Sequence, residues 1–274
     1  MGSSPILGDH ALQVANQMQD EALENAREHL ATEVSAQPYP LIFITVSGAH
    51  LYGFPSQDSD FDLRGAHIIP IEKLLGLGSE RETIERKVEI AGLEIETVTH
   101  DVRKYLRLLL KHNGYVLEQL YSPLIVHTTP EHDELKTLGR GCITRGHALH
   151  YLGFARNEWA LLEKRPSLKR LLYVYRVLLS GTYLMRTGSV EANLVKLNEV
   201  FRLPQIPDLI DQKISRTEWT EIAGDLSFHH GEYERLSGAL QAAAEASTLP
   251  ETVSSEDALN DFLIRIRLNP MESN

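Results

Sequence analysis

This sequence of 274 residues contains a single cysteine, Cys142. One thiol cannot form an internal disulfide or a zinc site made of several thiolates, so both are excluded, and the composition fits a reducing compartment. No apolar run reaches the roughly 18 residues that a membrane-spanning helix needs, and the N-terminus lacks a basic region followed by an apolar core. We therefore expect a cytoplasmic protein without a membrane segment.

Basic residues are scarce relative to acidic ones: 27 Lys and Arg stand against 38 Asp and Glu, for a formal net charge of −11. Duplex DNA binding depends on a large basic surface that neutralises phosphates, so we expect no strong binding of this kind. A nucleotide, a small polar substrate, a protein or an RNA held by a local basic patch remains compatible with the charge. The hydrophobic content of 42% is typical of a globular protein.

Two carboxylates at alternate positions, Asp60 and Asp62, begin a predicted strand that continues to Ile69. Because strand side chains alternate between faces, the two carboxylates project to the same side. They repel each other unless a cation lies between them, and hard oxygen ligands of this kind favour Mg²⁺ or Mn²⁺. The pair therefore predicts a metal site.

A glycine turn precedes this acidic pair by about a dozen residues. Residues Leu41 to Val46 are almost continuously apolar and rich in β-branched side chains, which predicts a strand covered on both faces. Ser47 and Gly48 follow directly. Glycine allows a sharp turn and a close backbone approach to a ligand, and the next N–H groups can face a phosphate. Many strands end in such turns, so this signal gains weight only from the carboxylates that follow.

A β-hairpin is predicted downstream, with arms at Thr83–Ile90 and Leu93–Thr99 joined across Ala91-Gly92. Glu94 and Glu96 share one face of the second arm. Either could supply a third metal carboxylate. An alternating polar face is also typical of the solvated side of a sheet, and that interpretation remains open here.

Residues 1 to about 128 combine strand and helix patterns, whereas the remainder is helical almost throughout. The predicted helices are His10–Val34, Ile71–Leu77, Asp101–Lys111 with Asp101 as its cap, Asn113–Leu120, Glu131–Leu138, Arg145–Lys164, Ser167–Thr187, Glu191–Phe201, Pro207–Ile214, Thr217–Ala244 and Glu256–Leu268. We predict an α+β fold: a mixed sheet flanked by helices, followed by an all-helical C-terminal domain. The expected domains are a catalytic domain at 1–128 and a helical nucleotide- or acceptor-binding domain at 129–270.

A basic and aromatic stripe is predicted in the second half, where Lys169, Tyr173 and Arg176 are spaced i, i+4, i+7 on one helix. Such a stripe can hold a triphosphate and stack on a base or ribose. The alternative is a charged outer face with its tyrosines in the core. A cationic cluster in so acidic a chain favours the functional interpretation.

Gly48-Ala49 followed by Ser59-Asp60-Phe61-Asp62 resembles the signature of the DNA polymerase β nucleotidyltransferase superfamily. More narrowly, the chain resembles the predicted nucleotidyltransferases that include the RNA-repair-pathway polymerase-β-like proteins. The narrower resemblance is carried by the stretches 47–65, 99–101 with 113–123, and 171–191. It covers most of the chain and implies a polymerase-β-like catalytic fold.

The resemblance also implies a chemistry and a set of site residues. Two Mg²⁺ (or Mn²⁺) ions would be held by Asp60, Asp62 and a third carboxylate, for which Glu96 is chosen and Glu94 is the alternative. The enzyme would transfer a nucleoside monophosphate from an NTP such as ATP to an acceptor hydroxyl, with an RNA 3′ end favoured and a protein or small molecule as alternatives, and would release pyrophosphate. The expected nucleotide-binding residues are Ser47, Gly48, Ala49, Arg64, Lys169, Tyr173 and Arg176. Arg64 could equally be an ion-pair partner of the carboxylates.

One departure from the superfamily pattern bears on function. The residue after the glycine is usually serine, and here it is Ala49, which keeps the backbone donor and lacks the hydroxyl. This suggests a second hypothesis, a catalytically lapsed module that binds a nucleotide or regulates a partner. A third is a metal-dependent glycosyltransferase, because these enzymes also use Asp-x-Asp to hold a nucleotide sugar. The glycine turn and the helical second half disfavour the third hypothesis.

Overall fold

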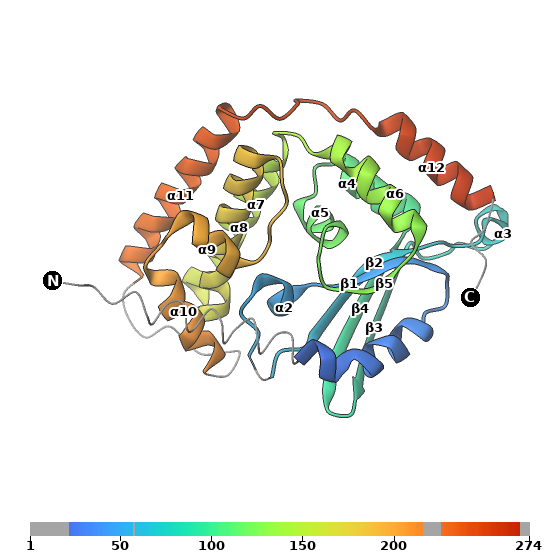
Figure 1. The fold of residues 1–274 in the computed structure, drawn as a ribbon, viewed down its shortest axis with the longest axis horizontal. Helices are drawn as coiled ribbons and strands as arrows, with labels where there is room; N and C mark the ends of the chain where they lie inside the picture. The colour runs from blue at the N-terminus through green and yellow to red at the C-terminus, as the bar shows by residue number, and fades with distance from the viewer. Residues whose placement is uncertain (1–21, 57, 216–225, 269–274) are drawn as a thin grey trace. The chain divides into compact units, whose positions relative to one another are not determined.

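The computed structural model describes residues 22–56, 58–215 and 226–268 (Figure 1). The first predicted helix is seen from residue 22 and runs to residue 35. Its predicted beginning at His10, and the part of the predicted helix 217–244 that precedes residue 226, lie outside the described residues. Within the described ranges, no helix combines the length and the apolar composition that a membrane crossing requires.

The chain forms two compact units, each assembled from separate segments. Among the described residues, the sheet unit contains 26–48, 60–144 and 250–268, and the helical unit contains 22–25, 49–56, 58–59, 145–215 and 226–249. These boundaries differ from the expected division at residue 128, because two helices distant in sequence, near residues 135 and 260, complete the sheet unit. The assignment of catalysis and acceptor binding to separate domains stays a prediction.

The sheet has five strands in the order β3-β4-β2-β1-β5. Strands β2 and β4 run parallel, and the other neighbouring pairs run antiparallel. This confirms the predicted mixed sheet. The strands are β1 (Leu41–Val46), β2 (Phe61–His67), β3 (Thr83–Ile90), β4 (Leu93–Asp101) and β5 (Ile125–Thr128). All residues of β1 are buried, as its continuous apolar pattern predicts.

The turn between β3 and β4 confirms the predicted hairpin. Ala91 and Gly92 have φ angles of 52° and 81°, which is the left-handed pair of a two-residue hairpin turn. This turn fixes the register, so that Lys87 lies opposite Glu96 and Glu89 lies opposite Glu94. Strand β4 continues to Asp101, beyond its predicted end at Thr99.

Helices cover both faces of the sheet (Figure 1). On one face, Phe43 of β1 meets Tyr105 of α4 edge-on at 5.4 Å between ring centroids and stacks on His132 of α6 at 4.3 Å. On the other face, Glu33 of the helix at 22–35 accepts a hydrogen bond from Arg86 of β3. The remaining elements of this unit are α3 (Ile71–Leu75), α4 (Val102–Leu110), α5 (Gly114–Leu120), α6 (Pro130–Gly139), the 3₁₀ turn η1 (Arg140–Cys142) and α12 (Glu256–Leu268).

Helix starts in the sheet unit follow the capping chemistry of the sequence. The Asp101 carboxylate accepts a hydrogen bond from the Arg103 N–H at 3.0 Å and caps α4, as predicted. Asn113 caps α5 in the same way through the Tyr115 N–H. These two caps set the starts of α4, which packs on β2 and β4, and of α5, which packs on β1 and β2.

The helical unit is built around α8, which packs against α7, α9, α10 and α11. Its helices are α7 (His147–Lys164), α8 (Leu168–Thr187), α9 (Leu194–Phe201), α10 (Gln205–Ile214) and α11 (Ser227–Glu245), and α2 (Gly48–Tyr52) follows β1. Helix α9 begins later than the predicted Glu191, because the Asn193 side chain caps it. Helix α10 begins earlier than the predicted Pro207, since proline is tolerated in a first helical turn.

Candidate metal centre

Three carboxylates gather at one place on the sheet. Asp60, Asp62 and Glu96 are all partly exposed, and each offers one oxygen that lies within 4.8 Å of the others. The parallel pairing of β2 with β4 sets Asp62 directly opposite Glu96, and Asp60 immediately precedes the first residue of β2. The structure therefore brings together the three residues that the sequence analysis chose as metal ligands.

Glu94, the alternative third carboxylate, has a different partner. Its side chain forms an ion pair with Lys87 of β3, across the hairpin. It lies one pleat away from Glu96 and opposite Glu89. Among the described residues, Glu96 and not Glu94 belongs to the group that could hold a metal.

The glycine turn makes room for Asp62. Gly48 has a φ angle of +62°, and a Cβ atom built on it would lie 2.0 Å from Asp62 Oδ2. The preceding Ser47 donates its N–H to the Asp62 carbonyl oxygen at 2.8 Å, which extends the β1–β2 ladder to the turn. Only glycine fits both this backbone conformation and this close approach. The Ser47 hydroxyl is buried, with no hydrogen-bond partner within the described part of the chain.

Arg64 bridges two of the three carboxylates. One guanidinium nitrogen, Nη2, lies 2.6 Å from Asp62 Oδ1 and 2.8 Å from Glu96 Oε1. Nη1 donates to the carbonyl oxygens of Leu63 and Glu96, both at 3.0 Å, and Nε donates to the Tyr115 hydroxyl at 3.3 Å. Of the two roles considered from the sequence, these contacts are those of an ion-pair partner. Phosphate binding by Arg64 stays a prediction.

The electrostatics of Arg64 follow from its neighbours. Burial acts to lower the pKa of the guanidinium, but Tyr115, Asp62 and Glu96 together outweigh it and raise the pKa above its ordinary value. Arg64 is therefore a permanent positive charge within the cluster. Its side chain is only 11% exposed, so solvent screens it weakly.

The donor set fits a hard divalent cation. Three carboxylates offer only oxygen ligands, which Mg²⁺ and Mn²⁺ prefer. Arg64 occupies one oxygen each of Asp62 and Glu96, and every carboxylate has two. Asp60, Asp62 and Glu96 would therefore hold the ion, with Arg64 beside it.

Two residues near the carboxylates were not predicted from the sequence as site residues. Tyr115 reaches Arg64 from α5, a contact that depends on how the helix packs and that no local pattern indicates. Lys87 lies opposite Glu96, and its pKa is raised chiefly by the hydrogen bond to Glu94, with smaller contributions from Asp60 and Glu96. The hairpin register alone could have placed Lys87 there, because a two-residue turn at 91–92 pairs it with Glu96.

The predicted basic and aromatic stripe forms on α8 in the helical unit. The Lys169 ammonium and the Arg176 guanidinium both lie 6.0 Å from the ring centroid of Tyr173. Arg176 also lies 3.7 Å above the ring of Tyr52 in α2, and it is only 2% exposed. Ala49, in the same short helix, is buried. The nucleotide-binding role of these residues stays a prediction.

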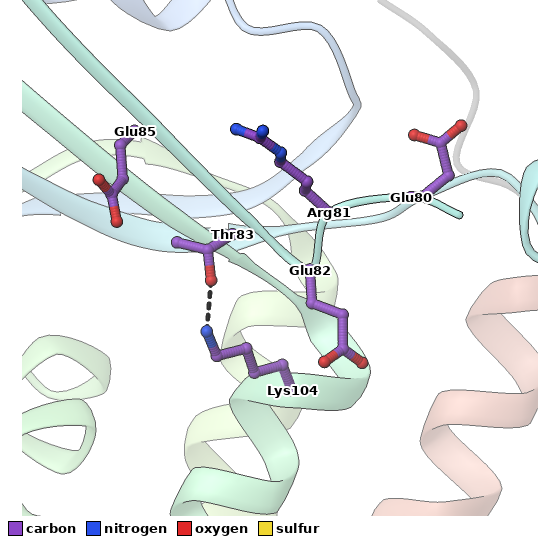
Figure 2. Close-up of a pocket in the computed structure, with 6 residues that line it drawn as sticks. All are labelled: Glu80, Arg81, Glu82, Thr83, Glu85 and Lys104. Carbon is purple, nitrogen blue, oxygen red and sulfur yellow. Dashed lines mark hydrogen bonds between the residues drawn. The ribbon is translucent and has the colours of Figure 1, made fainter. Parts of the chain in front are cut away.

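A polar hollow of about 630 Å³ lies elsewhere on the sheet unit, where the segment before β3 faces α4 (Figure 2). Within it, Lys104 donates a hydrogen bond to the Thr83 hydroxyl. Its lining residues are Glu80, Arg81, Glu82, Thr83, Glu85 and Lys104. None of the predicted site residues lines this hollow.

The sequence model of the RNA repair pathway DNA polymerase beta family matches residues 22–265. The uncharacterized protein MJ0002 of Methanocaldococcus jannaschii is 31% identical over 158 residues, which cover 56% of this chain and 63% of that protein. The chain thus spans less than two thirds of that relative. The uncharacterized protein YcgL of Bacillus subtilis is 27% identical over 85% of this chain and 90% of its own.

One solved structure, a nucleotidyltransferase-like protein from Exiguobacterium sibiricum, is similar at 14% sequence identity. The comparison covers 92% of this chain and 81% of that protein, with a TM-score of 0.34.

Proposed function

Because the chain belongs to the RNA repair pathway DNA polymerase beta family, we propose that it transfers a nucleoside monophosphate from an NTP to an acceptor hydroxyl and releases pyrophosphate. Membership of this family by itself identifies the chain as a polymerase-β-like nucleotidyltransferase. The observation that carries the proposal is the cluster of Asp60, Asp62 and Glu96 next to a glycine turn. An RNA 3′ end is the favoured acceptor, and a protein or small-molecule hydroxyl is the alternative.

The carboxylates have distinct parts in this proposal. Asp60 and Asp62 would hold Mg²⁺ or Mn²⁺ together with Glu96. A metal held there would supply two effects, a lower pKa of the attacking hydroxyl and neutralisation of charge on the leaving pyrophosphate. Glu96 has a side chain that is 39% exposed and one oxygen that does not bond to Arg64. That oxygen would hold the metal, and its remaining lone pair could accept the proton of the acceptor hydroxyl.

Nucleotide-binding residues are proposed on the family resemblance, for each unit by itself. Ser47, Gly48 and Ala49 form the phosphate turn, with backbone N–H groups as donors. Lys169 and Arg176 supply positive charge, and Tyr173 supplies an aromatic face. We place ATP among the accepted donors and the reaction in the cytoplasm, where a lone buried thiol such as that of Cys142 stays reduced.

Label transfer tests this function. The purified chain is incubated with Mg²⁺, each α-labelled NTP, and either RNA or total protein as acceptor. We expect transfer by the parent chain, and a loss of at least about 100-fold in Asp60→Asn and in Asp62→Asn, since each removes a metal ligand. The matched control is Glu82→Gln, which neutralises a carboxylate outside the cluster that pairs with Arg103. Equal transfer by the Asn variants would contradict the proposal.

The same assay separates the two other hypotheses. Nucleotide binding without transfer to any acceptor would support a lapsed module, which the alanine at position 49 suggests. Turnover of a nucleotide sugar in place of an NTP would support a glycosyltransferase.

A further inference from the structure

The Arg64 guanidinium makes more hydrogen bonds than an ion pair on the protein surface requires. A guanidinium has five N–H donors, and five hydrogen bonds to protein acceptors engage it, two to carboxylates, two to carbonyl oxygens and one to the Tyr115 hydroxyl. The carbonyl oxygens belong to β2 and β4 themselves. The charge is therefore fixed to the sheet and not carried on a mobile side chain.

This fixed charge changes the electrostatic balance of the cluster. Asp60, Asp62 and Glu96 contribute three negative charges when ionised, and Arg64 contributes one positive charge at hydrogen-bond distance. Lys87 also acts on Asp60 and Glu96, but it is paired with Glu94, so these two charges cancel. The remaining net charge of minus two is neutralised by one divalent cation. A second divalent cation would then meet an already neutral site and the repulsion of Arg64.

We propose that Arg64 is a positioning residue that acts as the built-in countercation of the metal centre. It orients Asp62 and Glu96 before metal arrives, and it limits the nucleotide-free protein to one tightly bound divalent cation. This inference rests on the proposed function, whose metal centre it describes.

Manganese titration of the nucleotide-free protein tests the inference, with free Mn²⁺ followed by electron paramagnetic resonance and the heat of binding by calorimetry. The parent chain binds one Mn²⁺ tightly. Arg64→Met binds a second Mn²⁺ at least about tenfold more tightly than the parent does, because the nearest repelling charge is gone. Arg64→Lys keeps the charge, and its second site stays as weak as that of the parent.

Arg103→Met is the matched control, because it removes a positive charge that pairs with Glu82 outside the cluster; its Mn²⁺ binding is that of the parent. Thermal unfolding in a chelator identifies variants that fail to fold. If Arg64→Met does not fold, Tyr115→Phe, which removes only the hydroxyl contact, provides the test: loosening Arg64 weakens the first Mn²⁺ site by at least about twofold.

Two tight sites in the nucleotide-free parent chain, or an unchanged second site in a folded Arg64→Met, overturn the inference and leave the proposed function standing. Absence of label transfer together with the expected manganese results overturns the proposed function and leaves the role of Arg64 standing.

Discussion

At the scale of single residues, the carboxylate cluster depends on what surrounds Asp62 as much as on Asp62 itself. Gly48 leaves space on one side, and Arg64 holds the carboxylate on the other. The Ser47 N–H fixes the backbone of the same residue. A side chain at position 48, or an uncharged side chain at position 64, would therefore move the carboxylate.

Gly48→Ala is expected to abolish metal binding and label transfer, because the new methyl group would collide with Asp62 Oδ2. The backbone strain of alanine at positive φ should also lower the free energy of unfolding by about 1 kcal/mol. Manganese titration and urea unfolding measure the two effects. Gly92→Ala is the matched control, because Gly92 also has positive φ but nothing within 4 Å of its added Cβ. It should lose stability and keep Mn²⁺ binding.

His67 makes stability depend on pH. Burial lowers its pKa to about 4, although Asp101 acts in the opposite direction, and Nδ1 contacts the Thr99 hydroxyl at 2.9 Å. The unfolded chain has a histidine pKa near 6.5 and takes up the proton first. The contribution of His67 is therefore complete above about pH 6.5 and is lost as pH falls toward 4.

His67→Gln is expected to reduce the loss of unfolding free energy between pH 7 and pH 4 by about 1–3 kcal/mol, because glutamine keeps a polar group and does not titrate. Urea unfolding at a series of pH values measures this. Thr99→Val keeps the histidine and should keep the pH dependence. If the unfolding free energy of His67→Gln changes with pH as steeply as that of the parent chain, His67 does not control the pH dependence of stability.

At the scale of elements, α12 is joined to the sheet unit by a buried ion pair. Arg267 donates to both carboxylate oxygens of Asp101 at 2.5 Å and also to the Ile69 carbonyl oxygen. Asp101 in turn caps α4 and accepts the Ile69 N–H. One carboxylate therefore connects β4, α4 and α12.

Arg267→Met is expected to destabilise the protein by about 3–5 kcal/mol, since it leaves the buried Asp101 carboxylate without its cation. Arg265→Met is the matched control on the same helix. Arg265 pairs with Glu134 where both side chains are 44–47% exposed, and such a pair contributes about 0–1 kcal/mol. Chemical denaturation of both variants measures the difference. Equal destabilisation would contradict the role assigned to Arg267.

At the scale of the whole molecule, neither compact unit is a continuous stretch of chain. The sheet unit needs α6, whose His132 stacks on Phe43, and α12, whose Arg267 pairs with Asp101. Both helices follow residue 128 in the sequence. A catalytic domain cut at that residue would lose them.

A fragment of residues 1–128 is therefore expected not to fold cooperatively, because losing both helices removes free energy comparable with the whole stability of a domain, about 5–15 kcal/mol. Circular dichroism during heating and the dispersion of amide proton signals test this against the full chain. Fragment 1–144 regains α6 and should gain helical signal while still lacking the Arg267 contact. A cooperative transition in fragment 1–128 would restore the boundary that the sequence suggested.

The sequence by itself determined the features that depend only on residues close to one another in the chain. Alternation and a two-residue turn gave the β3–β4 hairpin, and side-chain caps gave the starts of α4 and α5. The spacing of Asp60 and Asp62 predicted that both face one way. These features depend on neighbours a few residues apart, and backbone geometry translates such spacing directly into direction.

Only the tertiary structure decided how distant residues meet the acidic pair. The family resemblance favoured Glu96, and the parallel pairing of β2 with β4 places it directly opposite Asp62, while the packing of α5 brings Tyr115 to Arg64. The return of α12 to the sheet, likewise, has no local signal near residue 101. Such contacts depend on register and packing between segments far apart in the chain, and the pattern within one segment does not contain that information.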